Sequence, residues 1–248
     1  MDFTLEQYNQ LISALKCHHR YLIQHDIDQY PERALSVAEI ESNYGVTTTY
    51  YIRAQHFFSH SNLIRHLASM GHSIGYHYEN LAITHGNLER AYNDFCINLE
   101  LLRTIVPVNT ACAHGSPVSQ WDNKELWAHY DIHSLGIEYE PMLDTDFSKT
   151  LYLTDTGRRW DGYKVSVRDK VPQYQEQWTK EGLAFHTTDD IIHVLNNQQH
   201  PIHQKALLIN THPQRWLPFG IQWALETGVQ WWKNQAKRLL VISTAKNR

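Results

Sequence analysis

The sequence of 248 residues has little cysteine, no long hydrophobic run and no block of like charges. Its three cysteines are widely spaced and form no zinc motif, which predicts reduced, buried thiols in a cytoplasmic protein. No stretch approaches about 18 apolar residues, so we expect no membrane span. The first residues lack a basic region and an apolar core, so we expect no secretory signal. The net charge of −4, with both signs interspersed, argues against nucleic acid or an anionic membrane as a partner.

Histidine and aromatic residues are plentiful, with 17 His, 14 Tyr and 8 Trp. Aromatic rings can stack on the faces of sugars, although a large core with many half-buried tyrosines explains them equally well. The histidines permit metal binding without requiring it. The length suits a single α/β barrel.

Segments with strand and helix patterns alternate along the chain. The expected strands cover residues 21–28, 46–53, 72–79, 108–114 and 204–212, with shorter strands at 136–139, 150–155 and 162–168. The expected helices cover residues 3–17, 31–44, 62–70, 87–105, 123–130, 189–196 and 219–237. This alternation predicts one α/β domain over residues 1–248 that begins with the helix 3–17.

The first expected strand ends in two carboxylates, Asp26 and Asp28, beside His25. Side chains alternate along a strand, so Asp26 and Asp28 point the same way and repel each other unless a cation or a shared proton lies between them. One interpretation is a metal ligand plus a base. The alternative is that Asp28 caps the next helix and Asp26 is a surface residue.

Polar side chains recur at the ends of several expected strands. Ligands of α/β proteins bind at the carboxyl ends of strands, so these groups are predicted to meet. A lone histidine at such a position is usually structural, but the recurrence favours a metal-dependent hydrolytic site. The residues concerned are Asp26, Asp28, His77, Glu79, His114, Asp155 and His212.

Three stretches together resemble the polysaccharide deacetylase family, carbohydrate esterase family 4. They are Gln-His-Asp-Ile-Asp at 24–28, Gly-His-Ser-Ile-Gly-Tyr-His-Tyr-Glu at 71–79, and Leu-Ile-Asn-Thr-His-Pro at 208–213 with Trp216. The resemblance is to a divergent branch with His-Asp-x-Asp in place of adjacent aspartates. It implies a distorted (β/α) barrel of about seven strands that binds a divalent metal, usually Zn²⁺, and hydrolyses N-acetyl groups on sugars.

The resemblance also implies roles for individual residues. Asp26 falls on the general base and His212 on the catalytic histidine near the last strand. The family's metal-binding aspartate falls on Ile27. We therefore assign that role to Asp28, whose side chain points to the same side of the strand as that of Asp26.

The family's first metal-binding histidine falls on His77, whereas its second falls on Leu81. Zinc in a catalytic site takes about three protein ligands and keeps one open position. We expect His114 to be the third ligand, because it follows a neighbouring strand. Glu79 and His85 are the alternatives.

Other residues are expected to contact the substrate, and for the tryptophans and arginines a packing or ion-pair role is the alternative. They are Glu79, Asp155, Arg159, Trp160 and Trp216. The stretch 111–117 lacks the arginine that orients the base in the family. The substrate implied is a small molecule or oligosaccharide with an N-acetyl sugar, from surface polysaccharide (lipopolysaccharide) biosynthesis. The alternatives are a catalytically inactive carbohydrate-binding protein and a metal amidohydrolase that acts on a small non-sugar amide. The oligomeric state is not predicted.

Overall fold

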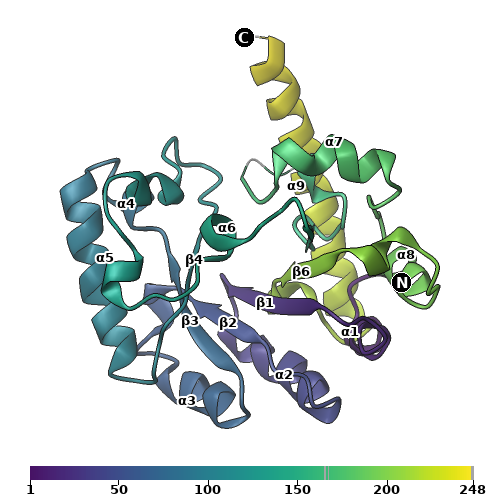
Figure 1. The fold of residues 1–248 in the computed structure, drawn as a ribbon, viewed down its shortest axis with the longest axis horizontal. Coiled ribbons are helices and arrows are strands. Elements are labelled where there is room, and N and C mark those ends of the chain that lie inside the picture. The colour runs from purple at the N-terminus through teal and green to yellow at the C-terminus, as the bar shows by residue number, and fades with distance from the viewer. Residues whose placement is uncertain (165, 167, 247–248) are drawn as a thin grey trace. The chain divides into compact units, whose positions relative to one another are not determined.

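The computed structural model describes residues 1–164, 166 and 168–246, with the backbone alone for residues 236–246. The chain forms two compact units (Figure 1). One unit is Ile23–Asp146, and the other combines Met1–Leu22 with Phe147–Arg248. The single domain over residues 1–248 stays a prediction.

The unit Ile23–Asp146 is built on parallel strands. Its strands are β1 (Tyr21–Ile27, which begins two residues before the unit), β2 (Thr49–Ile52), β3 (Ser73–Tyr78) and β4 (Ala111–Ala113). Each strand pairs in parallel with the next one along the chain. The register sets Asp26 beside Tyr51 and His77 beside Cys112, so the carboxyl ends of β1, β3 and β4 come to one edge.

This unit also contains α-helices, of which the longer ones pack apolar residues against its core. The α-helices are α2 (Ala34–Asn43), α3 (Ser61–Ser69), α4 (Asn80–Ile83), α5 (Leu88–Arg103) and α6 (Pro141–Asp144). The Asn87 side chain caps α5 by accepting a hydrogen bond from the Arg90 N–H. Helix α5 buries Phe95, Leu99 and Leu102, whose spacing places them on one helix face against the core that includes β3.

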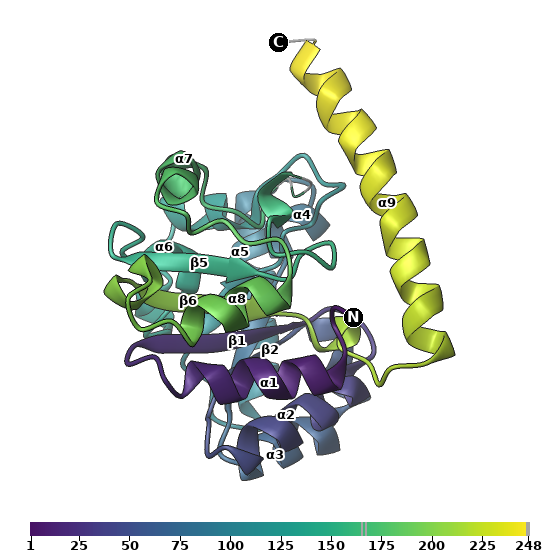
Figure 2. The same ribbon diagram turned by 90° about the vertical axis from the view of Figure 1, so that its right-hand side faces the viewer.

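The second unit contains one pair of parallel strands among its described residues, β5 (Thr150–Thr154) and β6 (Ala206–Thr211). Its helices are α1 (Leu5–Leu15), α7 (Pro172–Lys180), α8 (Thr188–Leu195) and α9 (Ile221–Lys246). Figure 2 shows α1 and α8 side by side, and the two helices are in contact. Thr187 starts α8 with a capping box that includes Asp190.

The predicted α/β class is confirmed, since strands alternate with helices and every registered strand pair is parallel. Six strands are found among the described residues, against about seven expected. Two of the predicted short strands are wrong. Residues 136–139 form no strand and make one isolated bridge at Tyr139, after a turn in which Gly136 adopts a left-handed conformation. Gly162–Lys164 is a 3-10 helix, and residues 165 and 167 of the predicted strand 162–168 lie outside the described residues.

Several helices differ from the expectation, and the short helices α4 and α6 have no predicted counterpart. Residues 123–130 contain a 3-10 helix, Asn123–Ala128, in place of an α-helix. Helix α7 has no counterpart among the predicted helices, because Trp178 is its one buried residue and no apolar periodicity announces it.

Candidate metal centre

Three predicted ligands converge at one edge of the unit Ile23–Asp146. Asp28, His77 and His114 each offer one ligand atom, and these atoms lie within 4.8 Å of one another. The Asp28 Oδ1 is 3.4 Å from the His77 Nε2 and 3.5 Å from the His114 Nε2. The three residues stand at or just beyond the ends of β1, β3 and β4, and the parallel pairing brings those ends together.

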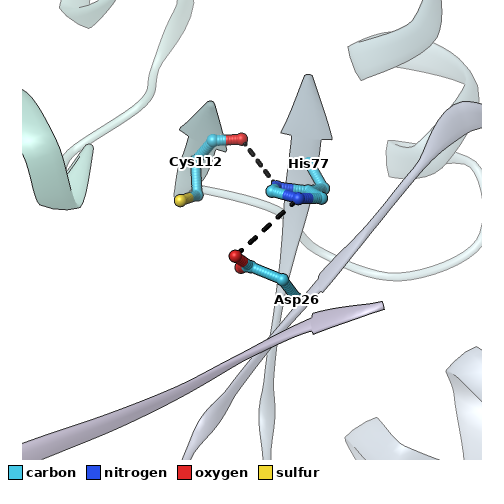
Figure 3. Close-up of side chains that lie close together, drawn as sticks. All are labelled: Asp26, His77 and Cys112. Atoms are coloured by element: carbon cyan, nitrogen blue, oxygen red, sulfur yellow. Dashed lines mark hydrogen bonds and ion pairs between the residues drawn. The ribbon is translucent and has the colours of Figure 1, made fainter. Parts of the chain in front are cut away.

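The His77 ring is held by the backbone of the neighbouring strand. Its Nδ1 lies 3.0 Å from the Cys112 carbonyl oxygen, and we assign the Nδ1–H as the donor (Figure 3). The Nε2 lone pair then faces the carboxylates. Metal-binding histidines are commonly fixed through the other ring nitrogen in this way.

The His114 ring is held by side chains. Its Nδ1 lies 3.1 Å from the Glu79 Oε2 and 3.1 Å from the Ser116 Oγ. Glu79 in turn accepts hydrogen bonds from the Arg53 guanidinium, with 2.9 Å between Nε and Oε1. Burial raises the pKa of Glu79, but the hydrogen bonds from His114 and Arg53 outweigh it and lower the pKa to about 2. Glu79 therefore stays ionised and aims the His114 Nε2 at Asp28.

Arg53 was missed by the sequence reasoning. It directly follows β2, at a strand end like the acidic and histidine residues that were counted, and this position was the available signal. Glu79 was predicted as a substrate contact and as an alternative third ligand. Both roles stay predictions, while the geometry gives Glu79 a supporting position behind His114.

Two carboxylates surround the buried His77 ring. The Asp26 Oδ2 lies 3.8 Å from the His77 Nε2, and Figure 3 shows its carboxylate near the Cys112 thiol. Burial lowers the pKa of His77, but Asp26 and Asp28 more than offset this effect and raise the pKa to about 9. The same excess of negative charge that holds a proton on His77 would hold a divalent cation in its place.

A second set of ligand atoms, from Asp26, His77 and Cys112, also lies within 4.8 Å. Both sets contain His77, and the exposure of their other members distinguishes them. The side chains of Asp28 and His114 are 20% and 16% exposed, against 8% for Asp26, and Cys112 is buried. A catalytic metal needs one position open to water, which favours the first set. Two imidazoles and a carboxylate are ligands that suit Zn²⁺.

The supporting role of Glu79 gives a testable prediction. Glu79→Gln keeps the shape but weakens the hydrogen bond that orients His114, so we expect metal affinity to fall about 10–100-fold. A competition titration with a chromogenic chelator measures the change. Glu138→Gln, an exposed carboxylate in the same unit, is the matched control. Equal affinity in both variants would remove Glu79 from the centre.

The raised pKa of His77 predicts how stability depends on pH without metal. Its stabilising charge is fully present below pH 6.5 and is lost as the pH rises through about 9. The free energy of unfolding of the chelated protein should therefore fall by roughly 2–3 kcal/mol over that range. Urea titrations at several pH values measure it. In His77→Gln the free energy of unfolding should depend less on pH between 6.5 and 9. An unchanged dependence would contradict the assignment of the raised pKa to His77.

Asp155 and His212 lie together in the other unit. The His212 Nδ1 is 2.6 Å from the Asp155 Oδ1, and the buried carboxylate also accepts hydrogen bonds from Arg215 and Trp216. Burial raises the pKa of Asp155, but Arg215 and His212 lower it below its usual range. Asp155 thus orients the His212 ring. The catalytic role of His212 and the substrate role of Asp155 stay predictions.

The remaining predicted substrate residues are engaged in packing or ion pairs. Arg159 pairs with Asp161, and Trp160 and Trp216 are buried beside Phe3. These contacts favour the packing and ion-pair alternatives that the sequence left open, and the substrate roles stay predictions.

Leu81 and His85, the two positions considered for a further histidine ligand, do not take part in the candidate centre. Leu81 is buried in an apolar cluster with Ala91 and Leu126. His85 follows α4, with its ring against Trp121, and belongs to neither ligand set. Among the described residues, His114 is therefore the histidine that joins Asp28 and His77.

No family model and no curated protein matches the sequence. The chain is similar in fold to a mutant of the peptidoglycan deacetylase PdaC from Bacillus subtilis, with 8% identity and a TM-score of 0.43 over 90% of this chain and 97% of that one. It is also similar to a mutant of BA3943, a CE4 family pseudoenzyme with restored enzymatic activity. That match has 9% identity and a TM-score of 0.44, over 89% of this chain and 64% of the other. The chemistry of this protein is inferred from its own side chains.

Proposed function

We propose that this protein is a metal-dependent hydrolase that removes the acetyl group from an N-acetyl sugar. The observation that carries the proposal is the convergence of Asp28, His77 and His114, with both Nε2 atoms directed at one carboxylate oxygen. Zn²⁺ is the proposed ion, because imidazole nitrogen and carboxylate oxygen are its usual ligands in hydrolytic sites.

The residues proposed to take part in the reaction have separate roles. A divalent ion at such a site supplies Lewis acidity and lowers the pKa of water. Asp26, beside His77, takes the proton from the attacking water as general base. His212 is proposed as the group that returns a proton to the departing nitrogen. The amide C–N bond breaks, a C–O bond forms, and acetate and a free amine leave.

The likeness of residues 24–28, 71–79 and 208–213 to motifs of polysaccharide deacetylases supports the choice of substrate. We propose an intermediate of surface polysaccharide biosynthesis that is met in the cytoplasm. Cys17, Cys96 and Cys112 are all thiols, which supports a reducing compartment. The prediction that all three are buried is wrong, since Cys17 is exposed and Cys96 is half-buried.

The test is elemental analysis of the purified protein combined with acetate release from N-acetyl sugars and from small non-sugar amides. We expect about one equivalent of metal, loss of acetate release after chelation, and recovery with Zn²⁺. Acetate release that survives chelation would contradict the proposal. Sugar binding without acetate release would identify a non-catalytic carbohydrate-binding protein, and release from the non-sugar amides alone would identify a different amidohydrolase.

A further inference from the structure

Helix α9 carries a stripe of large apolar side chains that is exposed. Ile221, Leu225, Val229 and Trp232 recur at intervals of three or four residues, which places them on one helix face. Each is more than half exposed, with Ile221 at 83% and Trp232 at 70%. The neighbouring Trp231 is exposed as well. Isolated exposed apolar residues are normal, but a contiguous stripe of this size marks an interaction surface.

The residues of α9 that contact the rest of its unit are mostly polar, together with Trp223, whose Nε1–H donates a hydrogen bond to the Asp2 carbonyl at 2.9 Å. Arg158 donates hydrogen bonds to Thr227, at 2.8 Å, and to Glu226, at 3.2 Å. The buried Asn234 donates to the Gly157 carbonyl at 2.8 Å. A surface helix ordinarily packs its apolar face inward and its polar face outward, and α9 does the reverse. Figure 2 shows α9 extending beyond the other elements of its unit.

The net charge of the C-terminal segment indicates what kind of partner covers the apolar stripe. Residues 221–248 contain five Lys or Arg and one Glu, a net charge of +4, whereas residues 1–220 carry −8. All five basic residues follow Trp232. The net charge of the whole chain argued against an anionic membrane. That net charge is the sum of a basic segment, residues 221–248, and an acidic remainder, residues 1–220.

We infer that α9 binds the surface of an anionic lipid bilayer. An amphipathic helix with Trp and Leu on one face and basic residues in its polar part lies in the membrane interface, where the apolar face is buried and the cations meet lipid headgroups. Among the described residues, no helix is apolar enough over a sufficient length to cross a bilayer. Parallel pairing with a second copy of the chain would bring two basic segments together, whereas an anionic bilayer is complementary to a basic segment. The inference does not depend on the metal centre.

The experiment is co-sedimentation of the full chain with vesicles of phosphatidylcholine, with or without phosphatidylglycerol. We expect binding to the anionic vesicles to be at least about fivefold stronger and to weaken with salt. The double variant Leu225→Gln/Trp232→Gln should lower it by at least about tenfold, which corresponds to 1.4 kcal/mol. Lys233→Gln should lower it about fivefold, on the anionic vesicles alone.

Ile97→Gln is the matched control, because Ile97 is an equally exposed aliphatic residue on α5 in the other unit. It should bind vesicles like the unchanged protein. Absence of binding to either vesicle, or equal binding by the double variant, would overturn the inference. A dimer in sedimentation velocity that the double variant dissociates would overturn it too, since a second copy would then cover the stripe.

Discussion

His77→Ala is expected to lose the bound metal and amide hydrolysis together. His77 is the residue that both candidate ligand sets share, so its removal disrupts either one. Loss of a direct ligand should lower metal affinity by more than about 100-fold, since loss of a supporting residue alone costs about 10–100-fold. Acetate release should fall with the metal content, measured by inductively coupled plasma mass spectrometry on the same sample.

The control for this substitution is His66→Ala, the same chemical change at an exposed position on α3. It should leave both metal content and turnover unchanged. His77→Gln fills more of the buried space and separates loss of a ligand from loss of the fold, which circular dichroism follows. An unchanged metal content in folded His77→Ala would remove His77 from the centre and with it the proposed function.

Asp26→Asn should keep the metal and slow hydrolysis by about 10²–10⁴-fold. The amide has the shape of the carboxylate but cannot take a proton from water at neutral pH. Asp26 lies 3.8 Å from the His77 Nε2 and belongs to the buried ligand set, outside the set that we assign to the metal. Single-turnover acetate release, with metal content measured in parallel, tests the prediction. Near-normal turnover in Asp26→Asn would exclude Asp26 as the base.

The variant Cys112→Ala tests which of the two ligand sets holds the metal. The Cys112 thiol is buried and belongs only to the set with Asp26 and His77. If Asp28, His77 and His114 hold the metal, Cys112→Ala retains it. Joint loss of metal in Cys112→Ala and Asp26→Asn would instead place the ion in the buried set.

The sequence located the candidate centre because its signals are local. Alternating side-chain direction put Asp26 and Asp28 on one side of β1, and His77 and His114 stand near the ends of their own strands. The parallel pairing that joins these ends follows from the alternation of strands and helices. The absence of histidine at Leu81 also directed attention to His114, which lies beside Asp28.

The contacts that support the centre could not be derived from the sequence, although the place of Arg53 at the end of β2 was a signal for that residue. The contact between Arg53 and Glu79 joins the ends of two strands separated by a helix, and no local pattern encodes it. The core positions of Trp160 and Trp216 depend on Phe3, which is distant in the sequence. The stretch 136–139 was misjudged because its apolar residues resemble a strand while Gly136 turns the chain.

Periodicity and residue chemistry by themselves determined the α/β class, most of the strands and helices, and the residue types at the candidate centre. Only the tertiary structure decided which oxygen faces which nitrogen, that Glu79 stands behind His114, and that the apolar side of α9 is the exposed one. The physical reason is that backbone periodicity depends on neighbours a few residues apart. Ring orientation and burial depend on atoms that only the fold brings close.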